Sequence, residues 1–226
     1  MKLRPNAQRA QAAIVMMYVM IALEATSLVS SVLQWMLLQD MKRGEINFDR
    51  INANDLREGI IAIIFSLAYI VSAVVFIRWF RRAYFNLHQR VSNLKYTEGW
   101  AAGAWFIPFF NWFGPYNIFK DLFTQSSNIL QSKGVTMKST LNMNVVNVYW
   151  AFWVLGSLIA NVSFQLTRRG DISALSTSTA LSIAANFMSL VAAFLLIQII
   201  RSYNDVEPLL EDMRSEIDEI GAIEQN

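Results

Sequence analysis

Apolar residues gather along the chain in four long runs, and polar segments separate the runs. They cover residues 14–38, 59–80, 145–164 and 179–200. A helix rises about 1.5 Å per residue, so about 20 apolar residues cross the roughly 30 Å hydrocarbon core of a bilayer. The pattern therefore predicts an all-α fold, an integral membrane four-helix bundle.

The runs predict a membrane domain over residues 1–202 and a tail over residues 203–226. Asp55 and Glu58 form a capping-box pattern directly before the second run, so we expect the second helix to start there. Residues 39–58 would then be a short polar connection on the outer face.

The first run is about twice as long as the apolar core of a signal peptide and no small-residue cleavage site follows it. We expect it to remain as a membrane anchor.

A fifth stretch, residues 100–119, is rich in aromatic residues but contains Pro108 and Pro115. Proline lacks an amide hydrogen and disfavours helix at the residue before it, so Ile107 and Gly114 are predicted break points. With four spans and the N-terminus inside, the inner segments carry 13 Lys and Arg and the outer segments 6; a fifth span would make this 10 and 9. Because basic residues favour the cytoplasmic side, four spans with both termini cytoplasmic are predicted. The stretch would then be a Pro-broken interfacial or re-entrant aromatic segment, within an interfacial segment over residues 81–138.

The composition supports a membrane setting and excludes several chemistries. The chain is 54% apolar and only 16% charged. It has no cysteine and a single histidine, His88, which excludes thiolate catalysis, iron–sulfur clusters and His-pair metal sites. We expect His88 to be exposed or interfacial. We also expect the protein to have no catalytic residues, metal or cofactor. Basic residues beside apolar runs indicate membrane orientation and not nucleic-acid binding.

In lipid, small and polar residues at helical spacing mark the faces where helices pack together. Each run carries such a stripe, which we call a seam: Met20, Glu24, Ser27, Ser31 and Gln34; Ala62, Ser66, Tyr69 and Ala73; Asn147, Gly156, Ser157, Ala160 and Asn161; Ser182, Asn186, Ser189 and Ala193. The favoured interpretation is that the seams face one another inside the bundle. The alternative is that they line a small hydrated cavity or a ligand path.

Glu24 is the one carboxylate inside the four apolar runs. An ionised carboxylate at that depth costs at least a few kcal/mol unless it is paired or hydrated. We expect Glu24 to form hydrogen bonds with neighbouring spans in a structural role, with Asn161, Asn186 and Tyr69 as candidate partners. A proton or cation relay is the alternative.

The tail is acidic and amphipathic. Residues 202–226 hold eight acids and one base, and the apolar residues recur at helical spacing. They predict a helix of about four turns, capped by Asn204 or Asp205, with Pro208 in its first turn. An acidic helix is repelled by an anionic membrane surface, so its apolar face should pack on protein. Either the basic cytoplasmic loop of the same chain or a partner protein would contact this face, which includes Leu209, Leu210, Met213 and Ile217.

The aromatic stretch reads GWAAGAWFIPFFNWFGPYNIFKDLF. Its motif residues are Trp100, Gly103, Trp105, Pro108, Asn111, Pro115 and Tyr116. This pattern resembles a family of bacterial membrane proteins, domain of unknown function 4328, over about residues 60–200. The resemblance implies a small multi-span protein of the bacterial cytoplasmic (inner) membrane, and it implies no catalytic residue.

Two interpretations of the motif remain open. The tryptophans and prolines would form an elbow that closes the cytoplasmic side of the bundle. Alternatively, Asn111, Tyr116 and Lys120 would present polar groups to a lipid headgroup or small ligand above an aromatic floor.

These patterns favour a non-enzymatic membrane protein that acts through association, as a subunit or assembly factor of an envelope complex. The expected partners are membrane lipid and either another protein or a second copy, through the tail and the seams. The alternative is a small transporter, channel or lipid-binding protein that uses Glu24 and the aromatic stretch. An enzyme is disfavoured, because the apolar runs hold one carboxylate and no histidine.

Overall fold

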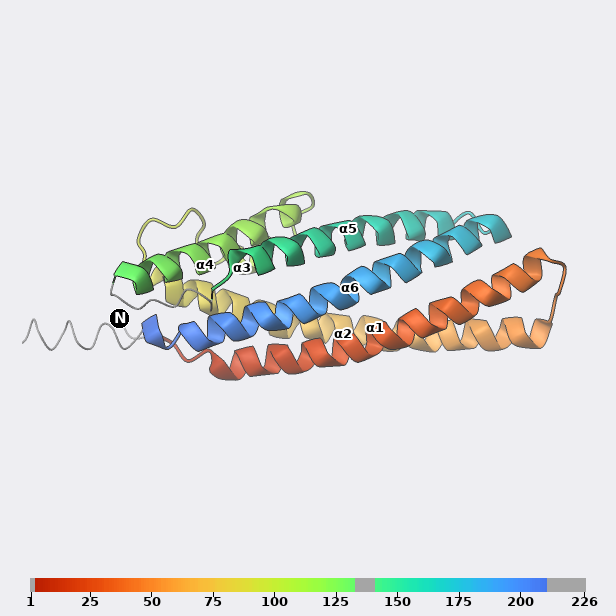
Figure 1. Cartoon of the computed structure of the whole chain (residues 1–226), viewed down its shortest axis with the longest axis horizontal. Helices are drawn as coiled ribbons and strands as arrows, with labels where there is room; N and C mark the ends of the chain where they lie inside the picture. The colour runs from red at the N-terminus through yellow and green to blue at the C-terminus, as the bar shows by residue number, and fades with distance from the viewer. Residues whose placement is uncertain (1–2, 133–140, 211–226) are drawn as a thin grey trace, which may run out of the picture. The chain divides into compact units, whose positions relative to one another are not determined.

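A computed structural model describes residues 3–132 and 141–210, and all regular secondary structure in these ranges is helical. The long helices are α1 (Ala7–Lys42), α2 (Phe48–His88), α5 (Met143–Thr167) and α6 (Ile172–Val206) (Figure 1). By length and composition, these four can each cross a membrane. The prediction of an all-α membrane protein with four spanning helices is confirmed.

The polar connection predicted over residues 39–58 is wrong, because α1 continues to Lys42 and α2 begins at Phe48. The Asp55–Glu58 pattern lies inside α2. Two residues set the turn instead. Gly44 has φ 90°, a conformation that favours glycine, and the side chain of Asn47 accepts a hydrogen bond from the Arg50 amide at 3.0 Å. An asparagine cap further upstream therefore starts the helix before the apolar run begins.

The aromatic stretch folds into short elements followed by a longer helix. These are α3 (Trp100–Gly103), the 3₁₀ helix η1 (Phe110–Trp112) and α4 (Gly114–Ser132). Pro115 lies in the first turn of α4, where a missing amide hydrogen costs nothing. Of the two proline-adjacent positions, Gly114 therefore starts a helix. None of these three elements is a candidate membrane span.

The chain divides into two compact units, and each of the four long helices contributes residues to both. Among the described residues, unit 1 comprises 3–15, 73–132, 141–147 and 196–210, and unit 2 comprises 16–72 and 148–195. Each unit has its own packing.

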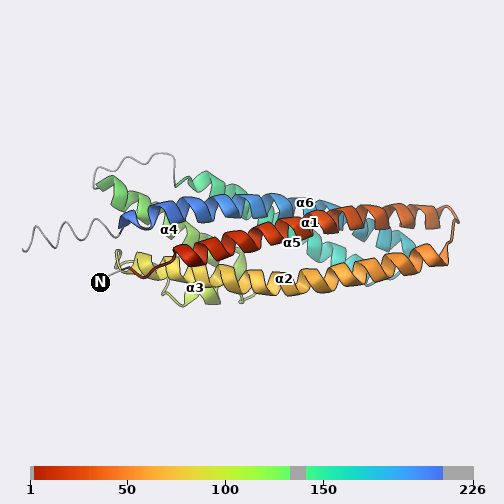
Figure 2. The same ribbon diagram turned by 90° about the horizontal axis from the view of Figure 1, so that it is seen from below.

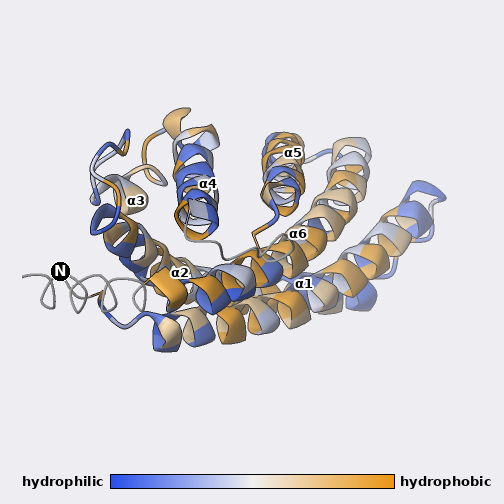
Figure 3. Ribbon diagram, turned by 60° about the vertical axis from the view of Figure 1, so that its left-hand side comes forward, coloured by the Kyte–Doolittle hydropathy of each residue, from blue (hydrophilic) through white to orange (hydrophobic). Residues whose placement is uncertain are grey.

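Aromatic side chains dominate the core of unit 1. Trp79, Phe80 and Tyr84 on α2 are fully buried, as are Phe119 on α4 and Tyr203 on α6. The ring centroids of Phe80 and Phe119 are 4.5 Å apart, and those of Trp79 and Tyr203 are 6.3 Å apart. The amphipathic helix α4, which has a clearly polar face in Figure 3, thus buries its apolar face against α2 and α6.

Unit 2 contains two antiparallel helix pairs. The turn at residues 43–47 joins α1 to α2 (Figure 2), and the turn at residues 168–171 joins α5 to α6 (Figure 1). The second pair packs closely at Gly156, where a Cβ atom would lie 3.3 Å from Cβ of Met188. Near the turn, the Ser163 hydroxyl donates to the Ser178 carbonyl at 2.7 Å and lies 2.8 Å from the Ser182 hydroxyl. Small side chains at these positions allow the close approach.

We expect Phe119→Ala to lower the free energy of unfolding by about 3–5 kcal/mol, because the substitution leaves a cavity among buried rings. Phe106→Ala is the matched control, since Phe106 is 74% exposed, and it should change stability by less than about 0.5 kcal/mol. Thermal unfolding of the purified protein in detergent measures both. Equal losses for the two variants would contradict the assignment of Phe119 to the core.

Candidate functional site

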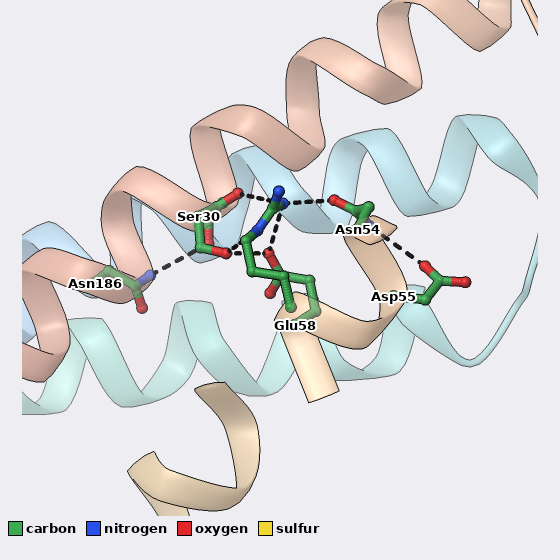
Figure 4. A network of polar contacts seen from close by, with 7 residues as sticks. Ser30, Asn54, Asp55, Glu58 and Asn186 are labelled. Atoms are coloured by element: carbon green, nitrogen blue, oxygen red, sulfur yellow. Dashed lines mark hydrogen bonds and ion pairs between the residues drawn. The ribbon is translucent and has the colours of Figure 1, made fainter. Parts of the chain in front are cut away.

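Four polar residues join α1 to α2 in unit 2, and we call them the Arg57 network: Ser30, Asn54, Arg57 and Glu58 (Figure 4). The Ser30 hydroxyl donates to Oε1 of Glu58 at 2.6 Å and accepts from Nε of Arg57 at 2.8 Å. Nη2 of Arg57 donates to Oδ1 of Asn54 at 2.6 Å and lies 3.4 Å from Oε1 of Glu58. The two helices are therefore held together by charge-assisted hydrogen bonds.

The burial of the network residues fixes the orientation of the guanidinium group. Asn54 and Arg57 are three residues apart and share one face of α2. Ser30 and Asn54 are buried, with exposed fractions of 3% and 7%, whereas the side chain of Arg57 is 34% exposed. Buried acceptors therefore hold one edge of a cation whose other edge remains accessible.

A second set of contacts joins α1 to α6. The Asn186 side chain donates to the Ser31 hydroxyl at 3.5 Å, next to the Arg57 network (Figure 4). Nearer the end of α1, the Gln39 side chain donates to the Ser176 hydroxyl at 2.8 Å. The polar groups of α1 thus face α2 and α6 within unit 2.

Glu24 is buried, with 7% of its surface exposed, and its Oε2 atom has no hydrogen-bond partner among the described residues. None of the three candidate partners donates to it. Asn186 bonds to Ser31, and Asn161 and Tyr69 are exposed. The expected hydrogen bonds from these residues are therefore not formed. Glu24 lies six residues before Ser30, about 9 Å along the helix axis.

The structure places the four predicted seams differently. The seam of α1 is inside, with Met20 and Ser31 buried, and that of α6 is half-buried. The seams of α2 and α5 were expected to face inward as well, and for most of their residues this is wrong. Ala62, Ser66 and Tyr69 on α2 are exposed and Ala73 is half-buried. On α5, the exposed residues are Asn147, Ser157, Ala160 and Asn161, whereas Gly156 is buried against α6.

Larger side chains take the inward positions on these two helices. On α5, Tyr149 and Trp150 are buried, with ring centroids 6.0 Å apart. On α2, Phe65 is half-buried on the inward face. Large rings bury more apolar surface at these inward positions, so most residues of the two stripes turn outward.

The motif residues of the aromatic stretch lie in unit 1. Trp105 packs edge-on against Phe76 and Phe80 of α2, at centroid distances of 5.4 and 6.0 Å. Trp100 is 38% exposed and packs 5.0 Å from the Phe110 ring. Gly103 ends α3, and Pro108 lies in the non-helical residues that follow. These contacts attach the stretch to the α2 side of the unit 1 core.

The polar members of the stretch do not converge on one point. Oδ1 of Asn111 is buried and has no hydrogen-bond partner among the described residues. The Tyr116 hydroxyl donates to Oδ1 of Asn147 on α5 at 2.9 Å, and Lys120 is exposed. Tyr116 therefore ties α4 to the start of α5.

Two backbone positions in this stretch, Gly114 and Phe109, are sterically restricted. A Cβ atom on Gly114 would collide with the ring of Phe110, so any other residue where η1 meets α4 would displace that ring. Nearby, Phe109 has φ 63°, and it is the one non-glycine residue with positive φ in the described ranges. The chain is held in a strained conformation at this point.

His88 contacts a polar cluster that its sequence neighbours did not indicate. Its ring packs edge-on against Tyr84 at a centroid distance of 4.8 Å, and Nε2 lies 3.0 Å from the Tyr96 carbonyl. The Tyr84 hydroxyl donates to Oδ2 of Asp121 at 3.1 Å. Burial raises the pKa of Asp121, although its hydrogen bond from Tyr84 opposes this effect. The fold thus places a carboxylate near the only histidine.

A second buried carboxylate belongs to Glu207, directly after α6. The Asn86 side chain donates to Oε1 of Glu207 at 2.7 Å, and the Asn6 side chain donates to Oε2 at 2.9 Å. Asn86 also bonds the backbone of Arg4 in both directions, at 3.0 and 2.9 Å. Glu207 therefore joins the N-terminal segment to the ends of α2 and α6 in unit 1.

The described part of the tail packs on its own chain. The expected cap at Asn204 or Asp205 is wrong, because α6 continues through both residues to Val206. Leu210 is 2% exposed, and it forms a cluster with Leu3, Leu130 and Val206 against which half-buried Leu209 packs. Met213 and Ile217 lie outside the described residues.

Residues 42–205 match the family described as "Domain of unknown function (DUF4328)". The chain belongs to the DUF4328 family. No curated protein and no solved structure matches it. The matched range confirms the resemblance inferred from the aromatic stretch and extends to the start of α2, so it includes the whole α2 part of the Arg57 network.

Two site features of this DUF4328 protein were not found from sequence. Arg57 and Ser30 become neighbours only when α1 and α2 pair, and Asp121 approaches His88 only when α4 packs on α2. For the Arg57 network, the sequence offered only the spacing of Asn54 and Arg57, which puts both on one face of α2. Within the described ranges, no group of three or more His, Asp or Glu residues is arranged to hold a metal ion.

Glu207 should give the DUF4328 protein a measurable pH dependence. Burial raises the pKa of Glu207 from its usual value of 4.5, against opposing hydrogen bonds from Asn86 and Asn6. A raised folded-state pKa contributes stability that is present below pH 4.5 and is lost as the pH rises through the folded-state pKa. We expect Glu207→Gln to remove this component, because its side chain stays neutral. Thermal unfolding between pH 4 and 8 measures the difference.

The amide introduced by Glu207→Gln can be accommodated, since Oδ1 of Asn6 is buried without a partner and can accept from it once the Asn6 amide rotates. Asp205→Asn is the matched control at an exposed acid and should retain the wild-type pH trend. An unchanged trend in Glu207→Gln would show that Glu207 is not the group responsible.

Proposed function

We propose that this DUF4328 protein is a non-enzymatic membrane protein that acts through association, as a subunit or assembly factor of an envelope complex in the bacterial cytoplasmic membrane. The supporting observation is the outward-facing stripe of Ala62, Ser66 and Tyr69 on α2. Small and polar residues at helical spacing let a second helix approach closely in lipid. The occupant we propose for this face is a transmembrane helix of another protein.

The exposure of α2 supports the same proposal. Its most apolar stretch has the highest mean hydropathy of the four spanning helices, 2.9, and is only 11% buried, against 22–33% in the other three. Lipid alone requires an apolar surface but no small residues. The stripe distinguishes this face from an ordinary lipid-facing surface, and the outward residues Ser157 and Asn161 of α5 add a second surface of the same kind.

The double variant Ala62→Leu/Ser66→Leu tests the α2 stripe, because bulky side chains prevent a close helix contact. The full-length protein is purified from its membrane in a mild detergent, and co-purifying proteins are quantified by mass spectrometry. We expect a stoichiometric membrane protein with the wild type and an at least about fivefold loss with the variant, equivalent to about 1 kcal/mol.

The control is Ile63→Leu/Leu67→Ile, which changes two exposed positions on a neighbouring face without adding bulk. It should retain the partner. A wild type that purifies without a stoichiometric partner contradicts the proposal, and so does equal capture by both double variants. A homo-oligomer that retains lipid would instead favour the lipid-binding alternative.

We also propose that both termini are cytoplasmic, on the basis of the distribution of Lys and Arg. Because the chain has no cysteine, single cysteines report orientation directly. Glu45→Cys and Arg169→Cys, in the two short turns, should react with a membrane-impermeant thiol reagent in intact spheroplasts. Ser92→Cys, after α2, should react only after lysis. The reverse pattern would show the opposite orientation.

A further inference from the structure

A groove of about 410 Å³ runs along the contact between α1 and α2 in unit 2. Its α1 side is formed by Ala25, Thr26, Val29 and Leu33, and its α2 side by Ile61. Arg57 and Ser30 of the Arg57 network complete it. The volume is in the range of small-ligand sites, about 300–1,000 Å³. The groove is therefore an open, mainly apolar depression with one cation on its wall.

Arg57 lies where a phospholipid headgroup would lie. It precedes the apolar run of α2, which begins at Gly59, by two residues. Ile61 is one turn further into that run, and Ala25 lies five residues from Ser30, about 7.5 Å along α1 in the same direction. The groove thus leads from the polar end of the span toward its apolar part. An acyl chain has the matching sequence of polar and apolar groups.

The guanidinium group is oriented before any ligand arrives. Its Nε and Nη2 atoms donate to Ser30, Asn54 and Glu58, whereas no hydrogen bond is formed by Nη1 within the described residues. The partners Ser30 and Asn54 are buried, so the Arg57 side chain would lose little conformational freedom when a ligand binds. An accessible guanidinium edge of this kind suits a phosphate oxygen.

The carboxylate of Glu58 narrows the choice of headgroup. Its Oε1 atom is used by Ser30 and Arg57, and its side chain is 30% exposed. A cation and a carboxylate side by side favour a ligand that presents both a phosphate and an ammonium group. A headgroup with negative charge alone would meet Arg57 and be repelled by Glu58.

We propose that this groove binds a zwitterionic phospholipid of the ethanolamine class. The phosphate accepts a hydrogen bond from Nη1 of Arg57, the ammonium group pairs with Glu58, and one acyl chain lies along Val29 and Ile61. The site is on a different face of α2 from the Ala62–Ser66 stripe and does not depend on association through it. Ser66 and Arg57 are nine residues apart, which puts them about 180° apart around the helix.

The test titrates the delipidated full-length protein with dioleoyl phosphatidylethanolamine or dioleoyl phosphatidylglycerol and measures bound lipid by native mass spectrometry. We expect the wild type to bind the ethanolamine lipid more tightly. Arg57→Gln should weaken that binding at least about tenfold, as expected for loss of one charge-assisted hydrogen bond. The matched control is Arg50→Gln. Arg50 also joins α2 to α1, through Asp40 at 3.0 Å, but does not line the groove, and its removal should leave affinity unchanged.

Because Arg57→Gln also removes contacts between α1 and α2, a second variant fills the groove and leaves the Arg57 network intact. Val29→Trp should abolish binding of both lipids, whereas Val32→Trp, which lies outside the groove on the same helix, should not. Glu58→Gln should reduce the preference for the ethanolamine lipid by about tenfold.

Three outcomes would overturn the proposal. Unchanged binding by Arg57→Gln or by Val29→Trp would show that the lipid lies elsewhere. Equal affinity of the wild type for the two lipids would show that Glu58 does not select the ethanolamine headgroup. Binding of free phosphoethanolamine as tightly as the complete lipid would show a soluble phosphate ligand instead, since no acyl chain would then contribute.

Discussion

The structure depends on one constraint, which is that polar groups at membrane depth need partners within the protein. Water is absent there, and an unsatisfied polar group costs free energy. At the polar end of the α2 span, where the apolar run begins, Ser30, Arg57 and Glu58 satisfy one another, because the serine hydroxyl both donates to the carboxylate and accepts from the guanidinium. The same requirement explains why Asn186 and Gln39 contact hydroxyl groups on a neighbouring helix. Polar contacts therefore determine how α1, α2 and α6 align in this unit.

Unit 1 is held together differently. Its core consists of stacked and edge-on aromatic rings from α2, α4 and α6, which are buried and closely spaced. Aromatic pairs contribute about 0.5–1.5 kcal/mol beyond their burial, so this core gives α4 a strongly preferred position on α2. Two carboxylates of the unit, half-buried Asp121 and buried Glu207, accept hydrogen bonds from other elements. The family motif supplies Trp105 to this core, which supports a structural role for that tryptophan.

The features proposed for function lie on opposite faces of one helix. One face of α2 carries Arg57 and Ile61 beside α1, and the other carries the stripe of small residues. A lipid bound between α1 and α2 would contact the same helix that presents the association surface. A bound ligand stabilises the state that binds it, so a lipid in the groove would favour the paired arrangement of α1 and α2.

Much of the fold follows from the sequence because runs of about 20 apolar residues are long enough to cross a bilayer and are stable there only as helices. The four spanning helices were predictable for this reason. Helix ends were less predictable, since the Asn47 cap and the turn at Gly44 act before the apolar run begins.

The side of each helix that faces inward was decided by tertiary structure. A stripe of small residues is compatible with packing inside the chain or with packing against another protein, and rings such as Tyr149 and Trp150 took the inward positions. The pairings of Arg57 with Ser30 and of Asp121 with Tyr84 also join residues far apart in the chain. The sequence determined how many helices cross the membrane, because that depends on local apolar length. Only the tertiary structure decided which polar groups meet, because that depends on how the helices rotate and align.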